Sequence, residues 1–225
     1  MRIRTTALLF CAACAWAQPQ SHENLNAVAW FQTSAEYAAS ARQTYAGATK
    51  SLKRALADKN WTAAIEQTGA FAELPPAVIL DLDETVLDNS AYEVAMLRAN
   101  APFSDVTWSR WVAEARAGTV PAAVRFLTNA RAAGVALFYV TNRVCKADDA
   151  SDPTVRVLRA LNVPLEPGRL MCKGEVSDKS PRRESVARTH RILLLVGDDL
   201  GDFVSLPKDR LTVEGRAAAV SAYED

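Results

Sequence analysis

From residue 77 onward, the hydrophobic positions form two kinds of pattern that alternate along the chain. Continuous apolar runs, "AVILDL", "ALFYVTN", "RLMCK" and "ILLLVGDD", occupy residues 77–82, 136–142, 169–173 and 192–199. Such short runs are typical of parallel strands that are covered on both faces. Helical patterns fill residues 89–100, 107–118, 121–134, 152–163 and 180–190. This alternation predicts an α/β fold, in which a Rossmann-like parallel sheet carries helices on both faces.

The chain before the first strand has a different pattern. Residues 22–74 are predicted to be helical, because apolar residues such as Tyr45, Leu52 and Leu56 recur at helical spacing. A break is expected at residues 58–60, followed by a second short helix at residues 62–71. We therefore predict one domain over residues 18–225. It would contain N-terminal helices at residues 22–74 and a core at residues 77–206, with a helical insertion at about residues 89–118.

The first twenty residues, "MRIRTTALLFCAACAWAQPQ", resemble an export signal. A basic start precedes an apolar stretch over residues 7–17, which is too short to span a bilayer but suits a secretory signal. We favour cleavage after Ala17; the alternative is lipidation of Cys14, which would give a lipid anchor. Either alternative predicts a periplasmic or secreted protein, the second as an outer-membrane lipoprotein. We therefore do not count residues 1–17 as part of the predicted folded domain.

The charge balance bears on the binding partners of the protein, and the cysteine count bears on its disulfides. Lys plus Arg and Asp plus Glu both number 26, so no basic field predicts a nucleic acid polymer as partner. The balance leaves a small-molecule partner open. Two cysteines remain after the signal, Cys145 and Cys172, and they are either paired or free buried thiols.

Polar residues follow each predicted strand. In an α/β sheet the ligand site lies beyond the carboxyl ends of the strands, so these residues should converge. The residues in question are Asp81 and Asp83 after the first strand, Thr141 and Asn142 after the second, Lys179 after the third, and Asp198 and Asp202 after the fourth.

The paired aspartates indicate the chemistry. Residues i and i+2 of a strand point to the same side, so Asp81 and Asp83 can face one substrate together. Adding Asp198 and Asp202 crowds like charges, which requires a cation. Oxygen ligands without His or Cys suit Mg²⁺. Such a site is suited to phosphoryl transfer, in which one carboxylate can act as the nucleophile.

Four segments together resemble a known family. "DLDETVLDN", "VTNR", "DKSPRR" and "GDDLGDF" are similar, in order, to the four motifs of the haloacid dehalogenase (HAD) superfamily. Their form resembles the secreted class C acid phosphatases of bacteria (HAD subfamily IIIB), over about residues 24–203. The resemblance implies a Mg²⁺-dependent acid phosphatase that hydrolyses phosphomonoesters, such as nucleoside monophosphates and aryl phosphates. It also implies an acidic pH optimum and a homodimer.

The resemblance further implies residue roles. Asp81 would be the nucleophile, and Asp83 the general acid and then the base. The metal would be held by the Asp81 carboxylate, the Asp83 carbonyl and Asp198. Asp202 would either bind the metal through a water molecule or contact the metal ligands without touching the metal. The phosphate would be held by Thr141, Asn142 and Lys179.

Several assignments stay open at this stage. Trp108 either packs in the core or forms a wall for the substrate, and Asp199 stands where the family usually has Asn. We interpret the arginines of the motifs as local ion-pairing residues, with phosphate binding as the alternative. These arginines are Arg143, Arg182 and Arg183. The family's strand order would bring Cys145 and Cys172 close together, whether bonded or free.

The end of the sequence also departs from the family pattern. Family members continue through a helix and a further strand to an Asn-Pro-x-Tyr-Gly segment, whereas this sequence stops at "RAAAVSAYED". Either the sequence is truncated, or the protein lacks this strand and one aromatic wall of the site. Two functional alternatives therefore remain: a catalytically weak binding or storage protein on the same scaffold, and a phosphotransferase.

Overall fold

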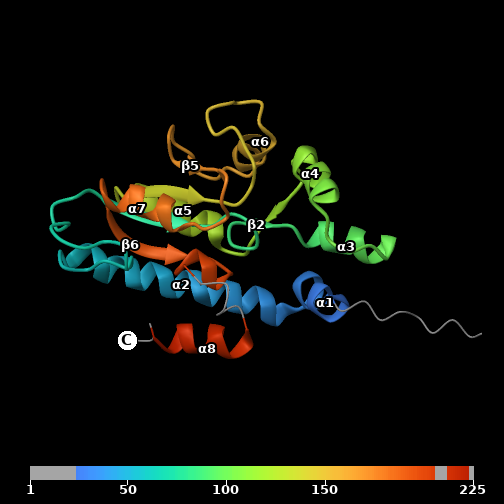
Figure 1. Cartoon of the computed structure of the whole chain (residues 1–225), viewed down its shortest axis with the longest axis horizontal. Coiled ribbons are helices and arrows are strands. Elements are labelled where there is room, and N and C mark those ends of the chain that lie inside the picture. Colours follow the sequence, from blue (N-terminus) through green and yellow to red (C-terminus); the bar gives the residue numbers. More distant parts are fainter. Residues whose placement is uncertain (1–23, 206–211, 223–225) are drawn as a thin grey trace, which may run out of the picture.

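The computed structural model describes residues 24–205 and 212–222, so the expected export signal lies outside the described residues. Its centre is a four-stranded sheet in the order β5-β4-β1-β6, with every neighbouring pair parallel. The strands are β1 (Pro76–Leu80), β4 (Ala136–Val140), β5 (Leu170–Met171) and β6 (Arg191–Val196). All four predicted strands are present, and the α/β prediction is confirmed (Figure 1).

Helices connect these strands and begin and end close to the predicted residues. Asp152 caps α6 through the Thr154 backbone N–H, and Pro153 occupies the first turn, where its missing N–H is tolerated. Gly134 follows α5 with a φ of +78°, a conformation that glycine adopts without strain. The helices after β1 are α3 (Ser90–Ala99), α4 (Asp105–Glu114), α5 (Ala123–Ala132), α6 (Pro153–Ala160), α7 (Ser180–Ala187) and α8 (Val213–Ser221).

The insertion after β1 contains a small element that the pattern did not predict. β2 (Leu87–Asp88) and β3 (Gly118–Thr119) form an antiparallel pair at the two ends of the segment that holds α3 and α4. This pair joins the start and end of the insertion beside the carboxyl end of β1 (Figure 1).

The N-terminal helices are α1 (Leu25–Thr33) and α2 (Ala35–Ala57), and α2 ends at the predicted break. The helix predicted at residues 62–71 is wrong: this segment is irregular. Its polar groups bond to the start of β6 instead, because Ala63 N–H donates to the Ile192 carbonyl and the Gln67 side-chain oxygen accepts from Ile192 N–H. These tertiary hydrogen bonds outweigh a weak local helical preference.

Both faces of the sheet are buried, as the continuous apolar runs predict. Along β1, Val78 and Leu80 pack in the larger core cluster, whereas Ala77 and Ile79 pack in the smaller one beside α7. The helix α2 runs along the sheet and contacts β6 (Figure 1). Among the described helices, none combines the length and apolarity that crossing a membrane requires.

Candidate active site

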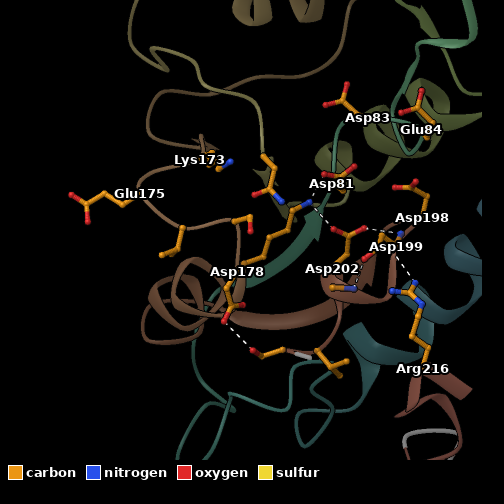
Figure 2. Close-up of a pocket in the computed structure, with 17 residues that line it drawn as sticks. Asp81, Asp83, Glu84, Lys173, Glu175, Asp178, Asp198, Asp199, Asp202 and Arg216 are labelled. Carbon is orange, nitrogen blue, oxygen red and sulfur yellow. Dashed lines mark hydrogen bonds and ion pairs between the residues drawn. The ribbon is translucent and has the colours of Figure 1, made fainter. Parts of the chain in front are cut away.

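The polar groups after the strands converge at the carboxyl edge of the sheet. Asp81 follows β1 directly, and its N–H donates to the carbonyl of Val196, the last residue of β6. This pairing brings Asp81 beside Asp198, and both line a cavity of about 750 Å³. Figure 2 shows the acidic residues gathered around this cavity.

Three carboxylates form the centre of the cavity. Asp81, Asp198 and Asp202 each offer one oxygen, and these oxygens lie within 4.8 Å of one another. Asp81 and Asp202 are buried, whereas Asp198 is exposed to the cavity. Hard oxygen donors at this spacing, without His or Cys in the group, are suited to a divalent cation.

Lys179 joins two of these carboxylates. Its Nζ donates to Oδ1 of Asp81, and it donates to Oδ1 of Asp202 at 2.6 Å. The lysine directly precedes α7 and is buried. Lys179 thus lies between Asp81 and Asp202 at the edge where the strand-end residues converge, while its contact with phosphate stays a prediction.

Burial and crowding alter the acidity of the cluster. Burial raises the pKa of Asp81 to about 7, although Lys179 acts in the opposite direction, and Asp202 raises it further. Burial also raises the pKa of Asp198, and the neighbouring Asp202 adds to this shift. Crowded carboxylates of this kind bind either a proton or a cation.

The loop after β6 is shaped around Asp202. Oδ2 of Asp202 accepts from the N–H of Asp199 at 3.1 Å, and Oδ1 of Asp199 accepts from Gly201 N–H at 2.7 Å, so the two residues cap the short helix η1 (Leu200–Asp202). A Cβ at Gly197 would lie 2.3 Å from Oδ2 of Asp202, which leaves room only for glycine.

Asp199 lies outside the three-carboxylate group. Its Oδ2 accepts from Arg216 of α8 at 3.1 Å, and its side chain is largely exposed. Burial acts to raise the pKa of Asp199, but the hydrogen bonds from Gly201 and Arg216 outweigh it and lower the pKa. Asp199 and Arg216 form part of the cavity wall.

Asp83 also lines the cavity, but its carboxylate is held by a different set of residues. Arg143 forms an ion pair with it at 2.6 Å, and Asn89 donates to Oδ1 at 2.8 Å. The ion-pairing interpretation of Arg143 is thus confirmed. Arg183 likewise pairs with Glu66, and it donates to the carbonyls of the η1 loop.

The residues predicted to hold phosphate occupy different positions. Among the described residues, Asn142 lines the cavity, whereas Thr141 and Trp108 do not. Thr141 is fully buried, and its Oγ1 accepts from the N–H of Arg143 at 3.1 Å. Trp108 packs against Tyr92 with ring centroids 5.2 Å apart, as the packing alternative expects. Contacts of Thr141 and Trp108 with substrate stay predictions.

Sequence reasoning missed several cavity residues, among them Glu84 and Lys173. Burial raises the pKa of Glu84 to about 8, and the neighbouring Asp83 adds to this shift. Its position next to Asp83 in the first motif was an available signal. Lys173 follows β5 closely, so the rule that placed the other strand-end residues applies to it as well.

Comparison with known proteins now identifies the family. The sequence model described as HAD superfamily, subfamily IIIB (Acid phosphatase), matches residues 5–217. The chain belongs to this family. Subfamily IIIB acid phosphatases are phosphomonoesterases, so this protein is a hydrolase of phosphomonoesters. HAD phosphatases generally use a divalent metal, and the Asp81, Asp198 and Asp202 group could bind one.

Solved structures agree with this assignment of the acid phosphatase fold. The class C acid phosphatase from Bacillus anthracis is 31% identical to this chain, with a TM-score of 0.75, over 88% of this chain and 77% of that one. A second structure of that enzyme, with tungstate bound, matches with the same values.

Proposed function

We propose that this acid phosphatase is an exported, Mg²⁺-dependent enzyme that hydrolyses nucleoside monophosphates and aryl phosphates through an aspartyl-phosphate intermediate. The observation that carries the proposal is the buried carboxylate of Asp81. It contacts Lys179 and lies with Asp198 and Asp202 at the end of a polar cavity. The tungstate-bound relative adds support, because tungstate is a tetrahedral oxyanion like phosphate.

The donor set fits a Mg²⁺ ion. The three carboxylates of the cluster would hold it, and the carbonyl of Asp83 is a further ligand by resemblance to the family. When bound, the cation neutralises these carboxylates and polarises a phosphate oxygen.

The chain's own residues supply the remaining chemistry. In the first step, an Asp81 oxygen forms a bond to phosphorus while the bond to the ester oxygen breaks, and Asp83 gives that oxygen a proton. In the second step, water forms a bond to phosphorus, the bond to Asp81 breaks, and Asp83 takes the proton of the water. The Lys179 ammonium and Asn142 would bind phosphate oxygens, since both line the cavity.

The lining of the cavity favours broad substrate acceptance. Among the described residues that line it, none is aromatic, and most are charged or polar. Stacking of a base on an aromatic side chain contributes about 1–3 kcal/mol in other proteins. We therefore expect p-nitrophenyl phosphate to be hydrolysed with little preference among nucleoside monophosphates. Trp108→Ala would then leave the relative activities on different nucleoside monophosphates unchanged, because Trp108 does not line the cavity.

Export has independent support from the cysteines. Cys145 and Cys172 form a disulfide with Cα atoms 5.5 Å apart, and such bonds persist in oxidising compartments. We propose a periplasmic or secreted location, with cleavage after Ala17 or lipidation of Cys14 as the two routes. The resemblance to class C enzymes adds a homodimer to this proposal.

The deciding experiment measures phosphate release from p-nitrophenyl phosphate and nucleoside monophosphates, with Mg²⁺ and with EDTA. Asp81→Asn should lower kcat by about 10³-fold or more while the protein stays folded, because an amide cannot attack phosphorus. Asp105→Asn, an exposed change outside the cavity, is the matched control.

Other outcomes separate the alternatives. Wild-type protein that binds tungstate but releases no phosphate under any condition would support a binding or storage protein. Formation of a phosphorylated alcohol when an alcohol is added would support a phosphotransferase. Near-normal Mg²⁺-dependent activity in Asp81→Asn would exclude the covalent mechanism.

A further inference from the structure

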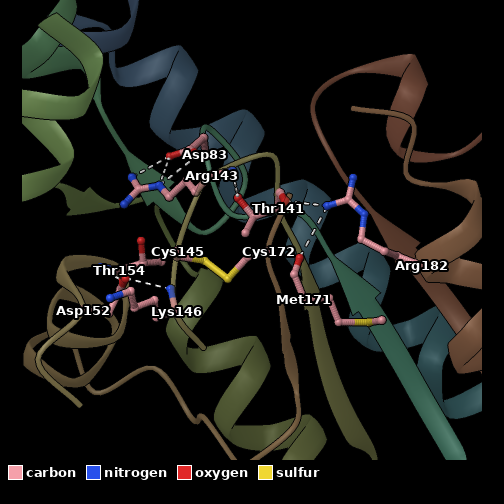
Figure 3. Close-up of a disulfide and its surroundings, with 10 residues drawn as sticks. All are labelled: Asp83, Thr141, Arg143, Cys145, Lys146, Asp152, Thr154, Met171, Cys172 and Arg182. Carbon is pink, nitrogen blue, oxygen red and sulfur yellow. Dashed lines mark hydrogen bonds and ion pairs between the residues drawn. A yellow bond between two sulfur atoms is a disulfide. The ribbon is translucent and has the colours of Figure 1, made fainter. Parts of the chain in front are cut away.

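The side chain of Arg143 is enclosed beside the cavity and directed at Asp83. Its side chain is 2% exposed, although it lies in the loop after β4. Arg143 Nε lies 3.0 Å from both carboxylate oxygens of Asp83, and Nη2 lies 2.6 Å from Oδ1 (Figure 3). A planar guanidinium that donates more than one hydrogen bond fixes the direction of a carboxylate as well as its charge.

A second buried side chain holds the same carboxylate. Asn89 is 1% exposed and donates from Nδ2 to Oδ1 of Asp83 at 2.8 Å. Its own oxygen accepts from Nε1 of Trp111 at 2.8 Å and from Nη2 of Arg143 at 3.2 Å. These contacts fix the orientation of the Asn89 amide, because only its oxygen can accept both hydrogen bonds.

The two oxygens of Asp83 therefore differ. Oδ1 receives hydrogen bonds from Asn89 Nδ2 and from Nε and Nη2 of Arg143, whereas Oδ2 receives one, from Arg143 Nε. A carboxylate oxygen has about two lone-pair sites, so Oδ1 is saturated. Oδ2 is the atom with a free site for a proton.

The Arg143 residue is itself fixed by two further contacts, one to its guanidinium and one to its backbone. The Trp108 ring lies 5.6 Å from its central carbon, a cation–π distance. The Arg143 carbonyl accepts from the N–H of Lys173 at 2.9 Å, next to the Cys145–Cys172 disulfide. Trp108 thus supports Arg143.

We propose that Arg143 is a positioning residue for Asp83. Together with Asn89, it holds the carboxylate so that Oδ2 carries the proton that is given to the leaving oxygen and later taken from water. This arrangement determines activity on phosphomonoesters with poor leaving groups, such as alkyl phosphates. The proposal rests on the proposed function, in which Asp83 transfers the proton.

The consequence for substrates follows from the leaving group. An alkoxide needs a proton as it departs, whereas p-nitrophenolate is stable enough to leave without one. General acid–base catalysis contributes about 10²–10⁴-fold where it is needed. Misdirection of Asp83 should therefore slow alkyl phosphates more than p-nitrophenyl phosphate.

The experiment compares Arg143→Lys with wild-type protein on p-nitrophenyl phosphate, an alkyl phosphate and a series of aryl phosphates with graded leaving groups. Lysine keeps the charge but loses the planar fork. We expect kcat/KM for the alkyl phosphate to fall at least about tenfold more than for p-nitrophenyl phosphate. The dependence on leaving-group acidity should become steeper, and inhibition by tungstate should stay unchanged.

Arg182→Lys is the matched control. Arg182 holds the same loop through the Thr141 carbonyl and Asn142 Oδ1, and it makes no contact with Asp83 among its hydrogen bonds. Its replacement should change both substrate classes by the same factor. An equal fall for both classes in Arg143→Lys, or no fall, would overturn the proposal.

Trp111→Phe keeps the test decisive if Arg143→Lys does not fold. It retains a large ring but removes the indole N–H that donates to the Asn89 oxygen, one of the two donors to that atom. We expect the same selective loss on alkyl phosphates, by a smaller factor of about three, because only one hydrogen bond to Asn89 is lost. Absence of this selectivity would overturn the proposal. Failure of wild-type protein to hydrolyse any substrate would instead contradict the proposed function.

Discussion

At the residue scale, Gly197 is the position where a single atom decides the geometry of the site. A Cβ added there would lie 2.3 Å from Oδ2 and 2.5 Å from Cβ of Asp202. Because the clash reaches the Cβ, the whole Asp202 side chain would have to move. That movement would break its contacts with Lys179 and with the N–H of Asp199.

We therefore expect Gly197→Ala to lower kcat/KM by about 10²-fold, the effect of a displacement of about 1 Å. The overpacked loop should also lower the free energy of unfolding by about 1–3 kcal/mol. Gly174→Ala is the control, since nothing lies within 4 Å of a Cβ there. Equal activity in the two variants, measured beside thermal unfolding, would show that the loop accommodates the extra atom.

The site shows what sequence reasoning can reach at this scale. Strand ends and motif order located Asp81, Asp198 and Lys179, because chain position alone brings them to one edge. The direction of a side chain depends on contacts between distant segments. Thr141 consequently turned out to be buried, and Trp108 was found behind Arg143 rather than in the cavity lining.

At the scale of elements, the loops after β4 and β5 are joined by the Cys145–Cys172 disulfide, which spans a sequence separation of 27 (Figure 3). Closing a loop of this length stabilises a protein by about 3–4 kcal/mol in the chain-entropy description. We expect the double variant Cys145→Ala/Cys172→Ala to lose free energy of unfolding of this order. Urea unfolding with and without reductant measures it.

The double variant is its own control for the reductant. Reducing agent should destabilise wild-type protein but leave the double variant unchanged. The intact mass of wild-type protein should be two hydrogens below that of its reduced form. Labelling of both thiols without reductant would contradict the bond.

Elements were predictable where their patterns are long. β1 and β4 are continuous apolar strands buried on both faces, and helices such as α5 show clear periodicity and end signals. β2 and β3 have two residues each, too few for a period to be visible. Residues 62–71 have only a weak helical preference, and the Gln67 side chain bonds instead to the end of α7, to His190 and to β6.

At the scale of the whole molecule, the balanced net charge conceals a local excess of acid. The cavity contains more carboxylates than cations, and among the latter Lys179 and Arg216 are already paired with aspartates. The balanced charge of the whole sequence gives no sign of a basic field, and it could not locate this acidic one. A concentrated acidic field of this kind links folding to pH and to divalent cations.

The last prediction concerns this linkage. Burial raises the pKa of Asp81 to about 7 and that of Glu84 to about 8, while carboxyls of unfolded chains titrate near 4. Between these values the metal-free folded state binds more protons than the unfolded state. Its free energy of unfolding should therefore fall as the pH rises from about 4 to about 8, by on the order of 4 kcal/mol at most for Asp81.

Mg²⁺ should act in the opposite direction, because it binds the ionised carboxylates and stabilises only the folded state. In EDTA, Tm should be lower at about pH 8 than at about pH 5, and millimolar Mg²⁺ should raise Tm more at the higher pH. Asp81→Asn removes one titrating carboxyl and one ligand, so both differences should shrink in this variant. Asp105→Asn should behave like wild-type protein. An equal effect of Mg²⁺ at both pH values would show that the cation does not bind the carboxylate cluster, since protonation of Asp81 at the lower pH must compete with any ion held there.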